Sequence, residues 1–232
     1  MRTNEGCLAV IPARGGSKGL PDKNIRLFAQ KPLIEHSIVA ALNSKYVQEV
    51  VVSTDNSKIA EVAKQAGASV PFLRPSELST DTARVIDAMK HAVGFYEEKL
   101  KCFFSYIMLL QPTSPLRQSL DIDQAFELLL QNNADSLQSV CEAETHPYLL
   151  RTIKNGQLTP YLTHEMEHKR RQDLDHLFAL NGAIYIVKRD VLMRDDALIG
   201  NKNCGYVMPK ERSVDIDCEA DLLLAEFYLS LQ

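Results

Sequence analysis

A glycine-rich run near the start of the chain holds the residues best suited to chemistry. Residues 11–21 read IPARGGSKGLP and continue with Asp22, Lys23 and Asn24. Glycines let backbone N–H groups converge on an anion, and arginine and lysine side chains complement its charge. The apolar residues 7–11 are typical of a buried strand, so we predict a triphosphate-binding loop at the end of that strand.

This loop fits neither of the two best-known phosphate-binding motifs. A Walker A loop ends in Gly-Lys followed by Ser or Thr, whereas Lys18 lies between Ser17 and Gly19. A dinucleotide fingerprint ending at Gly19 needs glycine at position 14, where this chain has Arg14. An ordinary strand-to-helix turn is the simpler interpretation, but the cations among the glycines favour phosphate binding.

A second group of functional side chains lies near the C-terminus. Asp215 and Asp217 alternate with Val214 and Ile216. In an extended backbone the two carboxylates project from one face, and the apolar pair anchors the other. Mg²⁺ prefers a few hard oxygen ligands completed by phosphates and water, so the pair predicts a magnesium site. The alternative is that Asp217 only caps the last helix and Asp215 is solvated.

The elements that position these groups alternate in type over the first 140 residues. We predict strands at 7–11, 47–53, 68–73, 103–110 and 134–141. Helices are expected after Pro32, after an N-cap at Asn56, over 82–99 and after an N-cap at Ser119. This order favours an α/β fold with a parallel sheet flanked by helices. Ligands bind at the carboxyl edge of such sheets, so the glycine loop and the turn at 111–117 are expected to face one site.

The pattern changes after residue 141. Residues 142–180 combine turn signals with a polar stretch, which predicts hairpins and an irregular excursion from the sheet. Residues 177–187 resume strand character, interrupted at Asn181 and Gly182. The final helix is expected to pack on the core through an apolar stripe. That stripe comprises Ala220, Leu223, Leu224, Phe227, Tyr228 and Leu231.

Composition limits the class of partner. With a formal net charge of −4 over 232 residues, the chain has no basic footprint for nucleic acid or an anionic membrane surface. Its five cysteines form no C-x-x-C pair, which indicates reduced thiols. We find no pattern typical of a signal peptide or a membrane span, and we expect a soluble, cytoplasmic protein.

The glycine-rich run resembles the signature of acylneuraminate cytidylyltransferases, the CMP-sialic acid synthetase family. Residues 111–117, 181–185 and 215–217 fit the same family in the same order. The resemblance implies a single domain over residues 1–232 with a Rossmann-like nucleotidyltransferase fold and a mixed, mostly parallel sheet. It implies transfer of CMP from CTP to the anomeric hydroxyl of a nine-carbon 2-keto sugar acid, with release of pyrophosphate.

The resemblance also implies a Mg²⁺-dependent homodimer. In such a dimer an excursion, here about residues 145–180, crosses to the partner subunit and helps to complete its sugar pocket. A bacterial surface-glycan pathway is the setting that the resemblance favours.

The residues themselves support this reaction. Nucleotidyl transfer requires an α-phosphate held in line with the sugar hydroxyl and a stabilised pyrophosphate leaving group. We expect the phosphates to be bound by Arg14, Gly15, Gly16, Ser17 and Lys18. Lys23 is predicted to lie near the reacting phosphorus and to form a catalytic set with Arg14 and Asp215. Mg²⁺ held by Asp215 and Asp217 would orient the hydroxyl and make it more acidic.

Further contacts follow from the resemblance. Asn24 and Arg74 are expected to contact the nucleotide, with Asp81 nearby. The candidates for the sugar pocket are Gln111, His146, Arg171, Gln172 and Asn181. The ordinary alternatives are that Arg171 belongs to a solvated basic run and that Asn181 only makes the turn before Gly182.

Three other functions share parts of this pattern. A cytidylyltransferase for an eight-carbon ulosonic acid would have the same fold and metal chemistry. A nicotinamide-dependent oxidoreductase would use Asp55 at the end of the second strand to bind a ribose. A non-catalytic nucleotide-binding protein is the third. Among nine-carbon acids, a legionaminic-type substrate stands beside sialic acid, since pocket shape rather than loop composition separates them.

Overall fold

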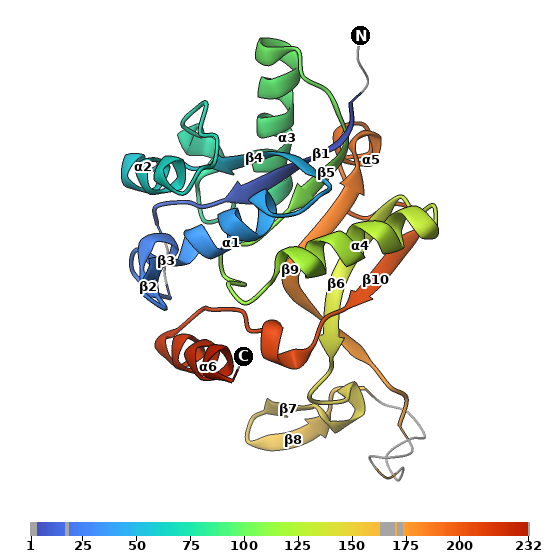
Figure 1. Cartoon of the computed structure of the whole chain (residues 1–232). Coiled ribbons are helices and arrows are strands. Elements are labelled where there is room, and N and C mark those ends of the chain that lie inside the picture. Colours follow the sequence, from blue (N-terminus) through green and yellow to red (C-terminus); the bar gives the residue numbers. More distant parts are fainter. Residues whose placement is uncertain (1–3, 17–18, 163–169, 171–173, 232) are drawn as a thin grey trace.

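A six-stranded sheet forms the centre of the molecule in a computed structural model, which describes residues 4–16, 19–162, 170 and 174–231. Its strands, in spatial order, are β10 (Asn203–Val207), β6 (Ser136–Glu142), β9 (Phe178–Lys188), β5 (Phe104–Leu109), β1 (Asn4–Pro12) and β4 (Val47–Ser53). Strand β1 runs parallel to β4 and β5, and β10 runs parallel to β6. Only β9 is antiparallel to its neighbours among these strands. The predicted mixed, mostly parallel sheet is confirmed (Figure 1).

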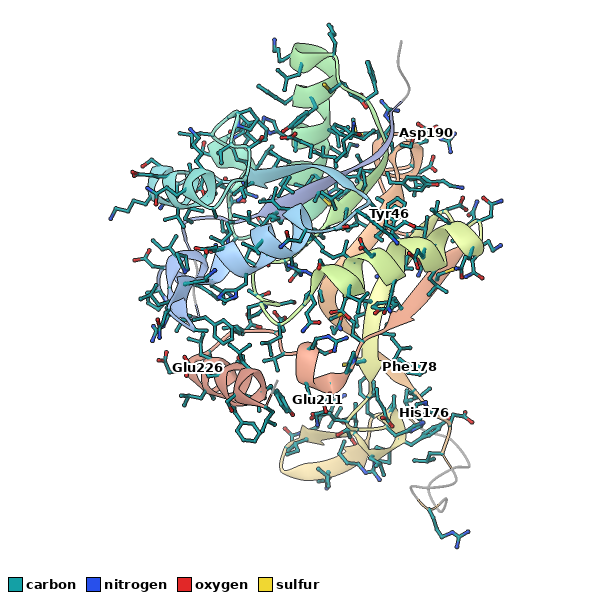
Figure 2. The ribbon with its side chains drawn as sticks, in the orientation of Figure 1. Tyr46, His176, Phe178, Asp190, Glu211 and Glu226 are labelled. Atoms are coloured by element: carbon teal, nitrogen blue, oxygen red, sulfur yellow. The ribbon has the colours of Figure 1, made fainter. Side chains whose placement is uncertain are left out.

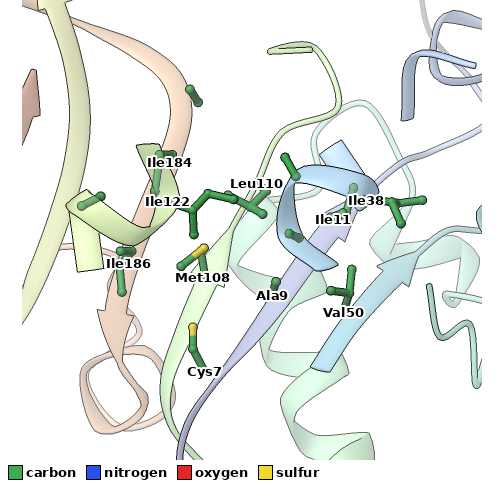
Figure 3. Packing of buried hydrophobic residues seen from close by; sticks show 14 of the residues in the cluster. Cys7, Ala9, Ile11, Ile38, Val50, Met108, Leu110, Ile122, Ile184 and Ile186 are labelled. Carbon is green, nitrogen blue, oxygen red and sulfur yellow. The ribbon is translucent and has the colours of Figure 1, made fainter. Parts of the chain in front are cut away.

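Helices cover both faces of this sheet. Successive side chains of a strand point to opposite faces, so Cys7, Ala9 and Ile11 of β1 enter one core while Leu8 and Val10 enter the other. The helices on the first face are α1 (Leu33–Leu42), α2 (Ser57–Gln65) and α4 (Ser119–Gln131). Those on the second face are α3 (Val85–Phe95) and α5 (Arg189–Met193). Figure 3 shows the packing of the first core.

The boundaries of α2 agree with the prediction, but the strand expected after it is wrong. Asn56 caps α2, because its side-chain oxygen accepts hydrogen bonds from the N–H groups of Lys58 (2.8 Å) and Ile59 (3.3 Å). Residues 68–73 form no strand and make only an isolated bridge from Ser69 to Val51. Pro71 lies in the middle of this segment and has no N–H to donate to a ladder.

Two helix starts also differ from the prediction. Helix α3 begins at Val85 rather than residue 82, and a π-helical turn (Tyr96–Leu100) extends it. The N-cap of α4 is Gln118 and not Ser119. The carboxylate of Asp121 accepts a hydrogen bond from the backbone N–H of Gln118 (2.9 Å), and this reciprocal capping moves the helix start by one residue.

The predicted excursion contains a hairpin outside the main sheet. Strands β7 (Arg151–Lys154) and β8 (Gln157–Pro160) form a separate two-stranded sheet. Asn155 and Gly156 turn between them with φ values of 52° and 79°, as expected for a tight hairpin. The hairpin projects from the body of the molecule beyond the end of β6 (Figure 1), and His176 and Phe178 lie where the excursion rejoins it (Figure 2).

The last helix, α6 (Glu219–Ser230), packs through a different face from the one predicted. Leu222 and Ala225 are buried, whereas Leu223, Leu224 and Phe227 are exposed. The helix carries apolar residues on both sides, so periodicity alone selects the wrong stripe. It does not cover the main core but completes a third cluster, with Leu20, Phe28, Leu33, Leu116, Val214 and Ile216.

Two findings bear on the setting in which the protein works. None of the helices in the described part of the chain is long and apolar enough to span a membrane. All five cysteines are described, and all are free thiols.

Candidate active site

A cavity of about 470 Å³ opens where β1 and β5 end. The chain after β1 contributes Arg14, Gly19, Lys23 and Asn24 to its wall. The turn after β5 contributes Gln111, Pro112 and Thr113, and Asp217 approaches from the C-terminal segment. The remaining wall is formed by Pro12, Arg74, Leu78, Thr80, Asp81, Ala83, Arg84 and Val85. The prediction that the glycine loop and the turn at 111–117 face one site is confirmed.

Cationic side chains gather at one end of this cavity. Arg14 forms an ion pair with Asp81 at 2.6 Å, and its carbonyl oxygen accepts a hydrogen bond from the Asn24 amide at 3.0 Å. Arg74 is buried and donates to the Ser79 hydroxyl at 3.1 Å. Burial lowers the pKa of Arg74 and the charge of Arg14 adds to this effect, while the carboxylate of Asp55 opposes it. An anion at this end would relieve the repulsion between the two guanidinium groups.

Asp55 holds the glycine loop. Its carboxylate accepts a hydrogen bond from the backbone N–H of Gly15 at 2.9 Å. A Cβ atom on Gly15 would lie 2.7 Å from the Asn56 amide nitrogen, so a side chain there would force the Asn56 side chain, which caps α2, to shift. The sequence pattern does not reveal this role for Asp55, because the contact joins two strand ends 40 residues apart. Gly15 and Gly16 do not line the cavity, and Ser17 and Lys18 lie outside the described residues.

Lys23 connects the glycine loop to the carboxylate segment, residues 213–218. It begins a short 3-10 helix, η1 (Lys23–Ile25), in which Asn24 is buried. Its ammonium group donates to the carboxylate of Asp217 at 2.8 Å and to the carbonyl oxygen of Ile216 at 3.0 Å. The Lys23 side chain is 16% exposed and that of Asp217 is 74% exposed, so the pair lies at the cavity mouth. Two motifs 194 residues apart thus meet directly.

The carboxylate segment has the predicted alternation. Val214 and Ile216 are buried, and Asp215 and Asp217 are exposed on the other side. The backbone N–H of Ile216 donates to the carbonyl oxygen of Thr113 at 2.8 Å, which ties the segment to the turn after β5. Although Asp215 is exposed as a whole residue, protein atoms crowd its carboxylate, and this partial desolvation raises its pKa. A hydrogen bond from Thr113 opposes the shift, and the charge of Asp217 adds to it.

Asp217 does not cap the last helix, so that alternative is wrong. The capping carboxylate belongs to Asp221, which accepts hydrogen bonds from the backbone N–H groups of Asp217 (2.9 Å) and Cys218 (2.8 Å). No group of three or more His, Cys, Asp or Glu side chains that could hold a metal occurs among the described residues. The pair of Asp215 and Asp217 is therefore an incomplete cage, which suits Mg²⁺ only together with substrate oxygens.

Gln111 lies beside the first of these carboxylates. A Cβ atom on Gly182 would lie 3.4 Å from Gln111 Oε1 and 3.9 Å from Asp215 Oδ2. Gly182 has a φ of 72°, and the ladder between β6 and β9 shifts register beside it. We call Gln111, Gly182 and Asp215 the acceptor cluster. The interruption predicted at residues 181–182 is a change of register within a continuous strand and not a break.

Asn181 is fully engaged inside the protein. Its side-chain oxygen accepts hydrogen bonds from the Ser139 hydroxyl (2.6 Å) and the backbone N–H of Ala183 (3.2 Å), and its amide nitrogen donates to the Ser213 hydroxyl (2.9 Å). Asn181 is only 5% exposed. This geometry does not support the predicted contact with a sugar; instead, Asn181 anchors the start of the carboxylate segment to the sheet.

The other predicted sugar residues lie apart from this cavity or outside the described residues. His146 is in the excursion, where its ring accepts a hydrogen bond from the backbone N–H of Tyr148 (3.2 Å) and stacks on the Tyr148 ring. It does not line the cavity formed by its own chain. Arg171 and Gln172 lie outside the described residues.

The cavity also has a wall that the sequence does not indicate. Residues 78–85 follow no recognisable motif. Besides Asp81, the residues of this segment that line the cavity are Leu78, Thr80, Ala83, Arg84 and Val85. Within this wall Arg84 is held by Asp87 at 2.6 Å and by Asp196 at 2.8 Å. The only available signal is the polar loop at residues 74–81, which separates two predicted elements.

The chain is similar to known cytidylyltransferases in sequence and in fold. A family model described as cytidylyltransferase matches residues 8–194. The chain is 40% identical to the CMP-N,N'-diacetyllegionaminic acid synthase of Legionella pneumophila, covering 97% of this chain and 96% of that protein. It is 37% identical to the N-acylneuraminate cytidylyltransferase of Streptococcus agalactiae serotype III, covering 93% of this chain and 51% of that protein.

A solved structure has the same fold at low sequence identity. A CMP:2-keto-3-deoxy-manno-octonic acid synthetase complexed with CTP superposes with a TM-score of 0.72 and 18% identity, over 97% of this chain and 99% of that chain. The family match includes both the glycine loop and the turn at 111–117, so the oxidoreductase interpretation is wrong. These matches show that the chain belongs to the cytidylyltransferase family and is a nucleotidyltransferase.

Proposed function

We propose that the protein transfers CMP from CTP to the anomeric hydroxyl of a nine-carbon 2-keto sugar acid and releases pyrophosphate. The observation that carries this proposal is the contact of Lys23 with Asp217, because it joins a phosphate-type loop at the cavity to the segment that carries the carboxylate pair. The cationic side chains in the cavity wall suit the triphosphate, and the acceptor cluster, of which Gln111 lines the cavity, suits a polyhydroxylated acid.

Among acceptors we favour an acid of the legionaminic type. The chain has 40% identity to a relative named for that acid, against 37% to a sialic acid enzyme. The first relative is also matched over 96% of its own length, against 51% for the second. The eight-carbon alternative has the weaker support, since its representative shares the fold at 18% identity.

In the proposed reaction the anomeric oxygen attacks the α-phosphorus of CTP, and the bond from that phosphorus to the bridging oxygen of the β-phosphate breaks. Arg14 and Lys23 are placed to offset the negative charge that develops on the phosphates. Asn24 fixes the loop by donating to the Arg14 carbonyl, and Arg74 adds positive charge at the same end. Gln111 is placed to hydrogen-bond the acid.

The carboxylate pair fits a magnesium ion. Asp215 and Asp217 supply hard oxygen ligands; burial raises the pKa of Asp215 and the charge of Asp217 adds to the shift, while the charge of Lys23 opposes it, so a further cation beside the pair would favour the ionised form. Bound Mg²⁺ would supply charge neutralisation and would orient phosphate and acid oxygens. The ammonium group of Lys23 pairs with the carboxylate of Asp217 in the structure. When Mg²⁺ binds, Lys23 must either release this carboxylate or share it with the metal ion.

We further propose that the protein acts as a homodimer through its excursion. A single two-stranded hairpin is marginally stable alone, and Ile153 in its first strand is 73% exposed. Exposed apolar residues in the described part of the excursion include Leu149, Leu150, Ile153, Leu158, Tyr161 and Leu162. Helix α6 adds Leu223, Leu224, Phe227 and Leu231 at the same lower end of the molecule in Figure 1. Apolar surface of this extent is typical of an interface between subunits.

The free thiols also support a reducing compartment. Disulfides are rare in the cytosol, and all five cysteines here are unpaired in the described chain. We therefore place the reaction in the cytoplasm as part of the proposal.

The experiment that tests the function measures pyrophosphate release from each of the four nucleoside triphosphates, with Mg²⁺ or with EDTA. The acceptors are sialic, N,N'-diacetyllegionaminic, pseudaminic and 2-keto-3-deoxy-manno-octonic acids. We expect release only with CTP, Mg²⁺ and a nine-carbon acid, and fastest release with the legionaminic acid. Faster turnover of the eight-carbon acid would refute the acceptor class, and equal release in EDTA would refute the metal requirement.

A further inference from the structure

Arg117 is a buried cation that the proposed reaction does not use. It ends the turn at 111–117 and is only 2% exposed. Its guanidinium donates to the carbonyl oxygen of Ala183 at 2.6 Å, to that of Gln111 at 3.3 Å and to the Ser37 hydroxyl at 2.5 Å. It thus joins three elements that are distant in the sequence.

The guanidinium lies where β5 and β9 separate. Leu109 pairs with Tyr185 at the end of their antiparallel ladder. If the ladder continued in the same register, Gln111 would lie opposite Ala183. Instead, both carbonyl oxygens accept hydrogen bonds from Arg117. The side chain therefore takes the place of the next ladder contacts and holds the two strands apart at this point.

This arrangement is costly. Burial lowers the pKa of Arg117 to about 9, and Asp121 opposes the shift only through space. Arg117 Nε has no hydrogen-bond partner within the described chain. A buried cation bonded mainly to carbonyl groups is weak evidence for stability, since an apolar side chain of similar volume often serves as well.

The benefit that offsets this cost is the geometry beside Arg117. The carbonyl it holds on one strand belongs to Gln111, and the carbonyl on the other follows Gly182 directly. Gln111 and Gly182 are two members of the acceptor cluster. The Ser37 hydroxyl also donates to the Gln111 carbonyl at 3.2 Å, so this residue is fixed from two sides.

We propose that Arg117 is a positioning residue that sets the spacing between Gln111 and Gly182 for the sugar acid. The inference rests on the proposed function, because it assigns Gln111 to the acceptor. Arg117 itself does not line the cavity. It lies behind the cluster, and the nucleotide end of the cavity is formed by other residues.

The test compares Arg117→Met and Arg117→Lys with the unaltered protein. We measure the dissociation constant of CTP by calorimetry, and kcat and KM for N,N'-diacetyllegionaminic acid by pyrophosphate release. We expect Arg117→Met to keep its CTP affinity and to lose about 10²-fold in kcat/KM for the acid, since a misplacement of about 1 Å costs this much. Arg117→Lys should recover part of the loss, because one ammonium can reach one carbonyl but cannot bridge both.

Two matched variants separate positioning from general destabilisation. Leu137→Ala opens a cavity in β6 and should lower the melting temperature while leaving the KM for the acid unchanged. Ser37→Ala removes one of the three partners of Arg117 and should raise that KM by less than Arg117→Met does. It also serves as the test variant if Arg117→Met does not fold.

Hydrogen exchange gives a readout that does not depend on turnover. We expect faster exchange in the peptide covering residues 108–117 of Arg117→Met, and not in that peptide of Leu137→Ala. The peptide covering residues 179–187 should exchange faster in both variants, because Leu137 pairs with Ile186. If the unaltered protein turns over no acid, the proposed function fails, and exchange then decides whether Arg117 holds the two strands. Unchanged exchange together with an unchanged KM would overturn the inference. A lower CTP affinity and a lower melting temperature together with a higher KM for the acid would assign Arg117 a purely structural role. That result would overturn the inference as well.

Discussion

The glycine loop and the carboxylate segment come into close contact at Gly19, and this makes Gly19→Ala a sharp test of the site. A Cβ atom there would lie 2.6 Å from the carbonyl oxygen of Asp217. Such contacts essentially never fall below 3.0 Å, so the two backbones must separate by at least about 0.4 Å. The φ angle of Gly19 is not in the left-handed region, so this contact alone opposes the substitution.

The size of the effect follows from this displacement. If a misplacement of about 1 Å costs about 10²-fold, a shift of about half that size costs about 10-fold in kcat. Affinity for CTP should change less, because the added Cβ meets the backbone of Asp217 and not Arg14 or Arg74. Overpacking of this kind typically costs about 1–3 kcal/mol of stability, which leaves the protein folded.

Pyrophosphate release measured at several Mg²⁺ concentrations checks this expectation. Gly94→Ala is the matched control, because Gly94 lies in α3 with no atom within 4 Å of the added Cβ. That control should keep full activity and gain slightly in melting temperature. Wild-type kcat and wild-type Mg²⁺ dependence in folded Gly19→Ala would refute the argument that the two motifs act together.

Four further predictions concern the same groups. The double variant Asp215→Asn with Asp217→Asn should fold but lose about 10²-fold or more in turnover, measured by pyrophosphate release; normal turnover would exclude the metal site. Because the folded state raises the pKa of Asp215, this carboxylate costs stability above that pKa and the cost disappears below the ordinary aspartate range. Asp215→Asn should therefore raise the melting temperature at pH 7 and have no effect near pH 3, and a decrease at pH 7 would contradict the assignment. Lys23→Ala should lower kcat by about 10²-fold and change CTP affinity less; an effect on affinity alone would make Lys23 a ground-state contact. Phe227→Asp with Leu223→Asp should shift the species seen in sedimentation from dimer to monomer, and an unchanged dimer would exclude α6 from the interface.

The sequence predicts best those features that depend on local chemistry or on a shared sheet edge. Asn56 is recognisable as a cap because its side chain bonds to the next turn of its own helix. The glycine loop and the turn at 111–117 are expected to meet because parallel strands end at the same edge. The alternation of Asp215 and Asp217 with buried residues needs only the two-residue period of an extended chain.

The features that cannot be predicted depend on tertiary contacts between distant segments. Helix α6 has apolar residues on two sides, and only the position of the third core cluster decides that Leu222 is buried and Phe227 is exposed. The roles of Asp55 and Arg117 follow from contacts with residues 40 and 66 positions away. The motif of Asn181 assigns it to the sugar, yet its amide is consumed by hydroxyl groups from two other segments.

The reversed direction of β9 has a consequence for how such a chain can diversify. Glu142 pairs with Phe178, and the N–H of Ala143 donates to the carbonyl of Leu177 at 2.9 Å, so the excursion leaves and rejoins the sheet at adjacent positions. In effect it is a long loop of an antiparallel hairpin. Insertions or deletions there change neither the strand order nor the cavity residues that precede it. The segment that we propose for subunit association can therefore vary in length and sequence while the strands that position the cavity stay the same.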